Sequence, residues 1–343
     1  MKVRRVLKRL MWGVLIIILI FIVVNLKWVV YGIGQAKGQF SIINNAVPVS
    51  ELLMDQNSPD SLIDKLHYLD SVKTYAFMGL NMAKSSIYSS IYDQKGQPVM
   101  FVVMACEPYA LENYEWEIPL AGNFPYLGFF DKQKAIKEWQ KIKKLGFDTR
   151  IRTVDGWSTL GFLDNPLLSD NLSDPKGNFA NLVLHEIAHE TVYIRDSTTL
   201  NENLASFIAD AGTIQMLTEW YGEDSEVFKE YKNSVMDYDM FSKHIIKGAE
   251  NLQILYNQFP HNLAETDKKR QKKEMISSII AGLDTISFNY PDIYVSAFKD
   301  SLPNNSFFMS FVRYRSSLGE FYDTLNNKFN GDLPAYIEYM KTW

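Results

Sequence analysis

The segment that most constrains the fold of this 343-residue chain is an apolar stretch that contains two histidines. It reads NLVLHEIAHETVYIRD, from residue 181 to residue 196. His185 and His189 are four residues apart, about 40° around a helix axis, so a helix projects both imidazoles from one face. The apolar neighbours favour burial, and buried imidazoles are costly without polar partners. We therefore expect a buried helix whose two histidines share a partner.

The residue between these histidines that matters most for chemistry is Glu186. Its carboxylate can reach a water held between the two rings without binding an ion itself. Two neutral imidazoles and one carboxylate hold Zn²⁺ with an open fourth position, where a water is activated. The single cysteine, Cys106, excludes a cluster of thiolates. We predict a zinc site with His185 and His189 as ligands and Glu186 as general base. The alternative is an ordinary helix with a chance pair of histidines.

The third ligand is sought in the next predicted helix, which begins TTLNENLASFIAD after a short break. A helix that returns antiparallel after this break would bring Glu202 to the two histidines. The alternative is a capping box from Thr199 to Glu202, in which the glutamate folds back on the start of its own helix. We favour Glu202 as the ligand, because two histidines need a third partner. Asn201 and Asp210 are predicted to support the ligands, although Asp210 is equally well explained as an ordinary polar residue.

The N-terminal segment has the composition of a membrane span. Five basic residues precede an apolar run from Leu10 to Val24, and Trp12 and Trp28 lie near its ends. About 20 such residues cross a hydrocarbon core of roughly 30 Å. The alternatives are a cleaved signal peptide and the buried helix of a soluble protein. Because the basic residues precede the span, we predict a single-pass bacterial inner-membrane protein whose main domain faces the periplasm.

The rest of the chain has predicted strands first and predicted helices later. Strands are expected over residues 98–107 and 147–157, a turn at Pro125 and Gly128, and a connector over 38–48. Helical periodicity covers residues 130–146, 178–195, 199–222, 224–257 and 263–287. We predict an α+β fold with a membrane anchor over 1–35 and one domain over 36–343. That domain combines a small N-terminal sheet with a mainly helical C-terminal half.

The charge distribution argues against a nucleic-acid partner. The net charge is −5, and acidic and basic residues are mixed along the chain. Binding to phosphates requires a concentrated basic surface, and none stands out. The predicted helix over 130–146 is basic, and we interpret its charged face as a solvated surface.

A peptide-cleaving centre of this kind needs groups that hold the substrate and stabilise the oxyanion. The segment DGWSTLGFL, residues 155–163, is the candidate edge strand for the substrate, and its glycines permit close backbone approach. The predicted contacts are Gly156, Trp157, Ser158, Thr159, Leu160 and Gly161. For the oxyanion, the nineteen tyrosines leave many candidates; we predict Tyr314, because it lies in one of the family-like motifs given in the next paragraph, with Tyr193 and His261 as alternatives. An exopeptidase also needs a carboxylate for the α-ammonium group of its substrate, and the candidates are Asp155, Asp164 and Glu117.

Several motifs make the chain resemble a bacterial aminopeptidase family of gluzincin-like zinc metallopeptidases. They run in order from residue 34 to residue 314: GQAKGQF, NFPYLGFFD, WSTLGFLDNPLLS, HEIAHETVYIRD, NENLAS and LPNNSFFMSFVRY. The resemblance implies a zincin-like α+β fold, bound Zn²⁺, and the ligands His185, His189 and Glu202. It also implies hydrolysis of peptides, with an aminopeptidase as the expected activity.

Two alternatives to an aminopeptidase stay open at the level of sequence. One is a membrane-anchored endopeptidase, which would have a groove open at both ends. The other is a non-catalytic binding protein that keeps the metal only for stability. The intact Glu186 argues against the second, because loss of the base is the simplest way to lose catalysis.

Overall fold

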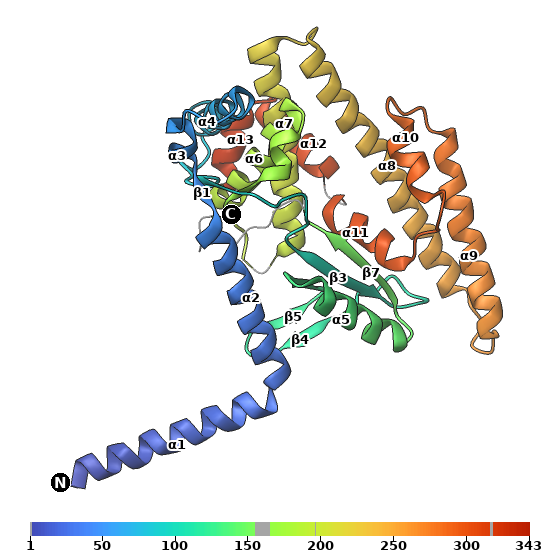
Figure 1. Cartoon of the computed structure of the whole chain (residues 1–343). Helices are drawn as coiled ribbons and strands as arrows, with labels where there is room; N and C mark the ends of the chain where they lie inside the picture. The colour runs from blue at the N-terminus through green and yellow to red at the C-terminus, as the bar shows by residue number, and fades with distance from the viewer. Residues whose placement is uncertain (1, 155–164, 196, 316–317) are drawn as a thin grey trace.

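Two antiparallel helices, α6 (Lys176–Thr191) and α7 (Thr198–Tyr221), lie in extensive contact at the centre of the molecule. The computed structural model describes residues 2–154, 165–195, 197–315 and 318–343 (Figure 1). Phe179, Val183, Leu184 and Ile187 of α6 are all buried. A helix that is apolar on most sides must be enclosed by other elements. α4 (Asp60–Gly79) packs against α6, and α12 (Leu318–Phe329) and α13 (Leu333–Met340) pack against α7.

A three-stranded antiparallel sheet with β3 (Phe101–Cys106) at its centre lies beside the helices. All six residues of β3 are buried, as its continuous apolar sequence predicts. β6 (Tyr126–Phe129) and β7 (Asp148–Thr153) flank it, and α5 (Lys132–Lys144) packs against the same sheet. The shorter strands form a second sheet and a hairpin: β1 (Val47–Pro48), β2 (Ser90–Tyr92) and β8 (Leu167–Leu168), then β4 (Trp116–Ile118) and β5 (Gly122–Phe124).

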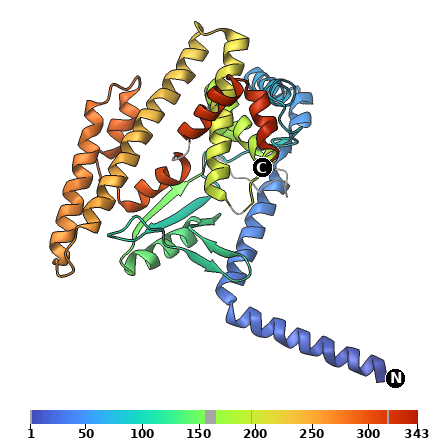
Figure 2. The same cartoon turned by 180° about the vertical axis from the view of Figure 1, so that it is seen from behind.

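A third layer consists of long helices that pack through their own aromatic core. α8 (Glu226–Asn257) crosses the molecule, and α9 (Glu265–Ala281) and α11 (Asn305–Arg315) pack on it. Figure 2 shows this layer from behind, with the turn between α8 and α9 at the end farthest from α6. The short elements of the chain are α3 (Val49–Met54), α10 (Pro291–Val295), η1 (Ser169–Ser173), η2 (Gly282–Thr285) and η3 (Ser296–Phe298).

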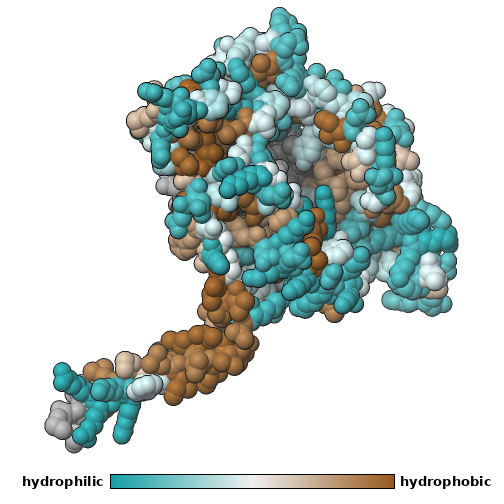
Figure 3. Space-filling model, in the orientation of Figure 1, coloured by the Kyte–Doolittle hydropathy of each residue, from teal (hydrophilic) through white to brown (hydrophobic). Residues whose placement is uncertain are grey.

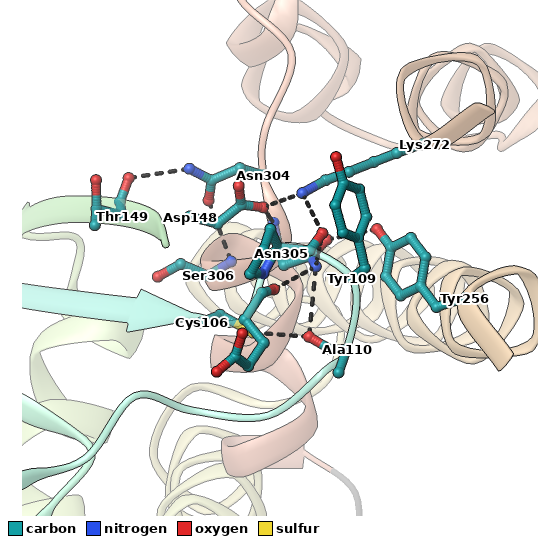
Figure 4. A network of polar contacts seen from close by, with 12 residues as sticks. Cys106, Tyr109, Ala110, Asp148, Thr149, Tyr256, Lys272, Asn304, Asn305 and Ser306 are labelled. Atoms are coloured by element: carbon teal, nitrogen blue, oxygen red, sulfur yellow. Dashed lines mark hydrogen bonds and ion pairs between the residues drawn. The ribbon is translucent and has the colours of Figure 1, made fainter. Parts of the chain in front are cut away.

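A buried polar network fastens this layer to the end of the sheet (Figure 4). Asn305, at the start of α11, donates to the carbonyl oxygen of Glu107 at 2.9 Å and accepts from the Tyr256 hydroxyl at 2.8 Å. Lys272 of α9 forms an ion pair with Asp148, and Asp148 accepts the backbone N–H of Asn305 at 2.8 Å. Buried polar groups that satisfy one another in this way favour a single arrangement. The network therefore fixes α8, α9 and α11 relative to β7.

The N-terminal helix α1 (Lys2–Val24) projects away from the body, and none of its apolar window is buried (Figures 1 and 3). It is long and apolar enough to cross a membrane. After Asn25 alone, α2 (Leu26–Asn45) begins and packs against the body. The predicted connector over 38–48 is wrong, because α2 continues to Asn45. Its contacts explain this length: the Tyr31 hydroxyl and the Gln35 amide donate to the Gly128 carbonyl at 3.0 and 2.7 Å.

The α+β class predicted from the sequence is confirmed. Among the described residues the strands all end by Leu168, and the large helices α6 to α9 follow. The predicted turn is found only at Pro125, which forms a bend between β5 and β6, whereas Gly128 lies within β6. Gly128 pairs with Val102 in the sheet, and its neighbours Leu127 and Phe129 are buried.

Candidate metal centre

Three side chains from α6 and α7 converge on one point. The Nε2 atoms of His185 and His189 are 3.2 Å apart. The Oε2 atom of Glu202 lies 3.7 Å from His185 Nε2 and 3.8 Å from His189 Nε2. All three ligand atoms lie within 4.8 Å of one another. The four-residue spacing along α6 and the return of α7 therefore place the three side chains as a metal centre requires.

The spacing of these atoms fits a small tetrahedral cation. With bonds of about 2.1 Å to nitrogen and oxygen, two ligand atoms of a tetrahedral Zn²⁺ are roughly 3.4 Å apart. The observed separations of 3.2, 3.7 and 3.8 Å bracket this value. Two imidazoles and one carboxylate are also the donor set that leaves a coordination position open. The residues present are therefore suited to hold zinc.

The turn between α6 and α7 determines where Glu202 points. Asn201 accepts the backbone N–H of Ile194 at 2.8 Å and donates to the Ile194 carbonyl at 2.7 Å. This pair of bonds ties the start of α7 to the segment that follows α6. The capping alternative is not observed: Ser197 is the N-cap of α7, it makes no side-chain cap bond, and Glu202 faces the histidines.

Glu186 is buried beside the three ligands, with 8% of its surface exposed. Its Oε2 atom has no hydrogen-bond partner among the described residues. Burial, opposed by the charge of His185 but reinforced by Glu202 and Glu190, raises the pKa of this carboxyl group. A buried carboxylate oxygen with no partner is costly, and such cost is expected where the group serves a reaction.

Residues 30–343 match the family described as "Putative aminopeptidase". The chain belongs to this family. The comparison with curated proteins and the comparison with solved structures gave no match. The matched span begins within α2 and includes the metal centre and all later helices, so the predicted family is confirmed over nearly all of the chain outside α1.

The electrostatics of the two histidines differ in this family member. Burial and the charge of His185 lower the pKa of His189 to about 4, so His189 is neutral and offers a lone pair. Burial also opposes the charged form of His185, but its bond to Glu202 and the nearby charges of Glu186 and Asp210 outweigh burial and raise its pKa. In the metal-free protein, these carboxylates thus favour a proton on His185. A divalent cation bound here would replace that proton.

Asp210 is close enough for its charge to help raise the pKa of His185, and it belongs to a small polar network. Its Oδ1 accepts from the Asn181 amide at 3.0 Å and from the Tyr231 hydroxyl at 3.4 Å. Neither donor was identified from the sequence. Asn181 precedes His185 by four residues and therefore shares its helix face, which is a signal that could have found it. Tyr231 comes from α8, which packs so closely on α6 that a Cβ at Gly177 would lie 2.5 Å from Tyr231. No local sequence pattern predicts this contact.

Several other predicted residues lie outside the part of the chain that the structure describes. These are Asp155, Asp164 and the substrate segment Gly156, Trp157, Ser158, Thr159, Leu160 and Gly161. Tyr314 belongs to α11, which contacts α7, but its side chain also lies outside the described part. Tyr193 follows α6 and is 56% exposed. His261 lies in the turn between α8 and α9, and Glu117 lies on β4, both well away from α6 in the two views (Figures 1 and 2).

Two residues near the centre were not expected from the sequence. Tyr88 is buried and holds a left-handed backbone with φ of 59°, which is strained for a tyrosine. Burial and the charges of Glu186 and Glu190 raise its pKa, so the phenol stays protonated beside the base. Arg152, near the end of β7, helps to lower the pKa of Glu202 through its charge.

Proposed function

We propose that this protein is a zinc-dependent peptidase with a zincin-like centre, and that it acts as an aminopeptidase. One observation supports this above all: three ligand atoms lie within 4.8 Å of one another next to the buried carboxylate of Glu186. The proposed ligands are His185, His189 and Glu202. Membership of an aminopeptidase family supports a peptide as the substrate.

The proposed mechanism assigns the proton transfers to Glu186. Burial raises its pKa, which makes its carboxylate a stronger base. It takes a proton from the attacking water and donates that proton to the amine nitrogen that leaves. Zinc, when bound, polarises the carbonyl group of the substrate and lowers the pKa of water. Asp210 and its partners hold the ligand helix in place, and Tyr314 is the proposed donor to the oxyanion.

The substrate is proposed to lie along residues 156–161, from Gly156 to Gly161. β7, an edge strand of its sheet, ends at Thr153, and this segment follows it closely in the sequence. An extended peptide can pair with such an edge through its main chain. Of the three candidate partners for the substrate's ammonium group, we keep Asp155 and Asp164, because Glu117 lies on β4, away from α6.

The location follows from α1. We propose that residues 1–35 anchor the protein in the inner membrane of a bacterium, and that residues 36–343 form a catalytic domain in the periplasm. α1 has 23 residues and is therefore roughly 35 Å long, enough for a hydrocarbon core of about 30 Å. Its basic residues precede the apolar part, which favours a cytoplasmic N-terminus.

The test combines metal analysis with peptide hydrolysis. Glu186→Gln should keep zinc at the wild-type level and lose activity by at least about 100-fold. His185→Ala should lose zinc, whereas His67→Ala, an exposed histidine on α4, should keep both zinc and activity. Full activity of Glu186→Gln, or unchanged zinc in His185→Ala, would contradict the proposed mechanism.

The choice between an aminopeptidase and an endopeptidase is tested with matched peptides. An aminopeptidase should cleave peptides with a free N-terminus and leave their N-acetylated forms intact. Equal cleavage of both forms would identify an endopeptidase instead. Peptide binding without cleavage of either form, in zinc-loaded protein, would identify a binding protein.

A further inference from the structure

A groove lies between the first helix of the body and the basic helix of the sheet. It has a volume of about 570 Å³ and is bounded by α2, α5 and β6. Its apolar lining comes from two segments that are far apart in the sequence. α2 contributes Trp28 and Tyr31, and β6 with the residue that follows it contributes Leu127, Phe129 and Phe130. This groove is separate from the metal centre, which lies between α6 and α7.

Lysines from two helices surround this groove. They are Lys27 and Lys37 of α2 and Lys134, Lys137 and Lys141 of α5. The two carboxylates that line the groove are already engaged. Glu138 binds Lys27 at 3.1 Å and accepts from Trp116, while Asp131 caps α5 through the backbone N–H of Gln133. With five lysines against two carboxylates, the groove combines an apolar interior with a net positive rim.

Three of these lysines are available to a ligand. Among the described residues, Lys37, Lys134 and Lys137 form no ion pair with a carboxylate, and all three are exposed. The position of Lys134 is clear from its neighbour on α2: a Cβ at Gly34 would lie 3.5 Å from its Nζ. Its ammonium group thus points across the groove toward α2.

The walls of the groove are held together rather than loosely apposed. Besides the two bonds to the Gly128 carbonyl, α2 approaches the body so closely that a Cβ at Gly38 would lie 2.1 Å from the Phe130 ring. Lys27 of α2 is bound to Glu138 of α5. The groove is therefore a built feature of the docked helix.

The groove begins where the apolar helix ends. Lys27 stands three residues after Val24, the last residue of α1. Leu26, Val30 and Ile33 of α2 are 56%, 50% and 64% exposed, so apolar surface continues from α1 onto α2 (Figure 3). An apolar surface that continues from a membrane helix belongs at the membrane interface. At that level, lysines attract the head groups of anionic lipids.

We propose that this groove binds an anionic phospholipid of the surrounding membrane, with an acyl chain on the apolar lining and the phosphate between Lys37, Lys134 and Lys137. This binding would seat the body against the bilayer. The inference depends on the anchoring of α1 in a membrane and not on the peptidase activity. It also changes our interpretation of α5, because the basic face that was expected to be merely solvated contributes part of a ligand site.

The experiment uses the full-length protein in detergent, titrated with phosphatidylglycerol or with phosphatidylcholine of the same acyl chains. Bound lipid is counted by native mass spectrometry. Lys134→Gln/Lys137→Gln removes two charges from the groove, and Lys143→Gln/Lys144→Gln removes two from the same helix outside it. The groove variant should bind phosphatidylglycerol about tenfold more weakly, or worse, while the control stays within about twofold of the wild type.

The outcomes separate this proposal from general attraction and from the hydrolase. Equal loss in the two variants, equal binding of the two lipids, or no retained phosphatidylglycerol would each overturn it. If a second copy of the chain occupied the groove, the wild type would be a dimer and the groove variant a monomer. That result would overturn the lipid proposal as well. Glu186→Gln should bind lipid like the wild type, so a failed peptidase assay leaves this test intact.

Discussion

Asp210→Asn should weaken zinc binding by about 10- to 100-fold, or roughly 1.4–2.7 kcal/mol. Asp210 is only 6% exposed, and its Oδ1 accepts bonds from Asn181 at 3.0 Å and from Tyr231 at 3.4 Å. An asparagine oxygen can accept the same two bonds, so the local packing is retained. What disappears is the negative charge that helps to raise the pKa of His185, and with it the basicity of a ligand.

Tyr231→Phe provides a milder version of the same perturbation, and Tyr256→Phe is its control. Both tyrosines lie on α8 and are about equally buried, at 4% and 5% exposure. Tyr256 donates to Asn305 at 2.8 Å, in the network that joins the helices to the sheet. Each substitution should cost about 1 kcal/mol of folding stability. Only Tyr231→Phe should also weaken zinc binding, by a few-fold.

The zinc affinity of each variant is measured by competition with a chromophoric zinc chelator at one fixed pH. The melting temperature of each metal-free protein is measured in parallel. The unfolding data separate a loss of fold from a loss of affinity. If Asp210→Asn binds zinc as tightly as the wild type, the charge behind the histidines does not tune the site. If Tyr256→Phe weakens zinc binding as much as Tyr231→Phe does, the loss of affinity comes from lower folding stability, and the reasoning is wrong.

Two further predictions concern stability. Gly38→Ala should lower the melting temperature relative to Gly32→Ala, because a Cβ at Gly38 would lie 2.1 Å from Phe130 whereas one at Gly32 meets nothing within 4 Å. The change in helix propensity is the same in both variants, so the difference in their stability, about 1–3 kcal/mol, measures the clash. Equal melting temperatures would show that α2 is not tightly docked. In metal-free protein, Glu186→Gln should be more stable than the wild type at neutral pH, because burial raises the pKa of Glu186 and ionisation is then penalised. The gap in melting temperature should be absent near about pH 4 and should widen as pH rises through the raised pKa; a gap that narrows with rising pH would have the wrong sign.

The part of the centre that could be predicted from the sequence depends on local geometry. The four-residue spacing of His185 and His189 places two rings on one helix face wherever the helix lies. Glu202 required one further step, the antiparallel return of α7, and the short break between the helices was enough to suggest it. The buried strand β3 and the long helices were similarly visible, because their periodicity is a property of each segment alone.

What could not be predicted depends on contacts between distant segments. Gln35 binds the carbonyl of Gly128, 93 residues later, and this contact turns an expected connector into a docked helix. Pairing with β3, which precedes it in the sequence, places Gly128 within a strand where the sequence suggested a turn. The left-handed backbone of Tyr88 depends on its tertiary contacts, and the residues next to it in the sequence do not predict it. Arg152 of β7 affects the pKa of Glu202 of α7, and the sequence gives no sign that these distant segments interact.

Only Asn25 separates α1 from α2, and α2 is bonded to the body along its length. A long glycine- or serine-rich tether would let a catalytic domain sweep a wide volume above its anchor. For a chain anchored through α1, this junction leaves almost no such slack. The candidate metal centre would then lie at a nearly constant height over the lipid head groups, and any peptide that it cleaves, as we propose, would have to reach that height.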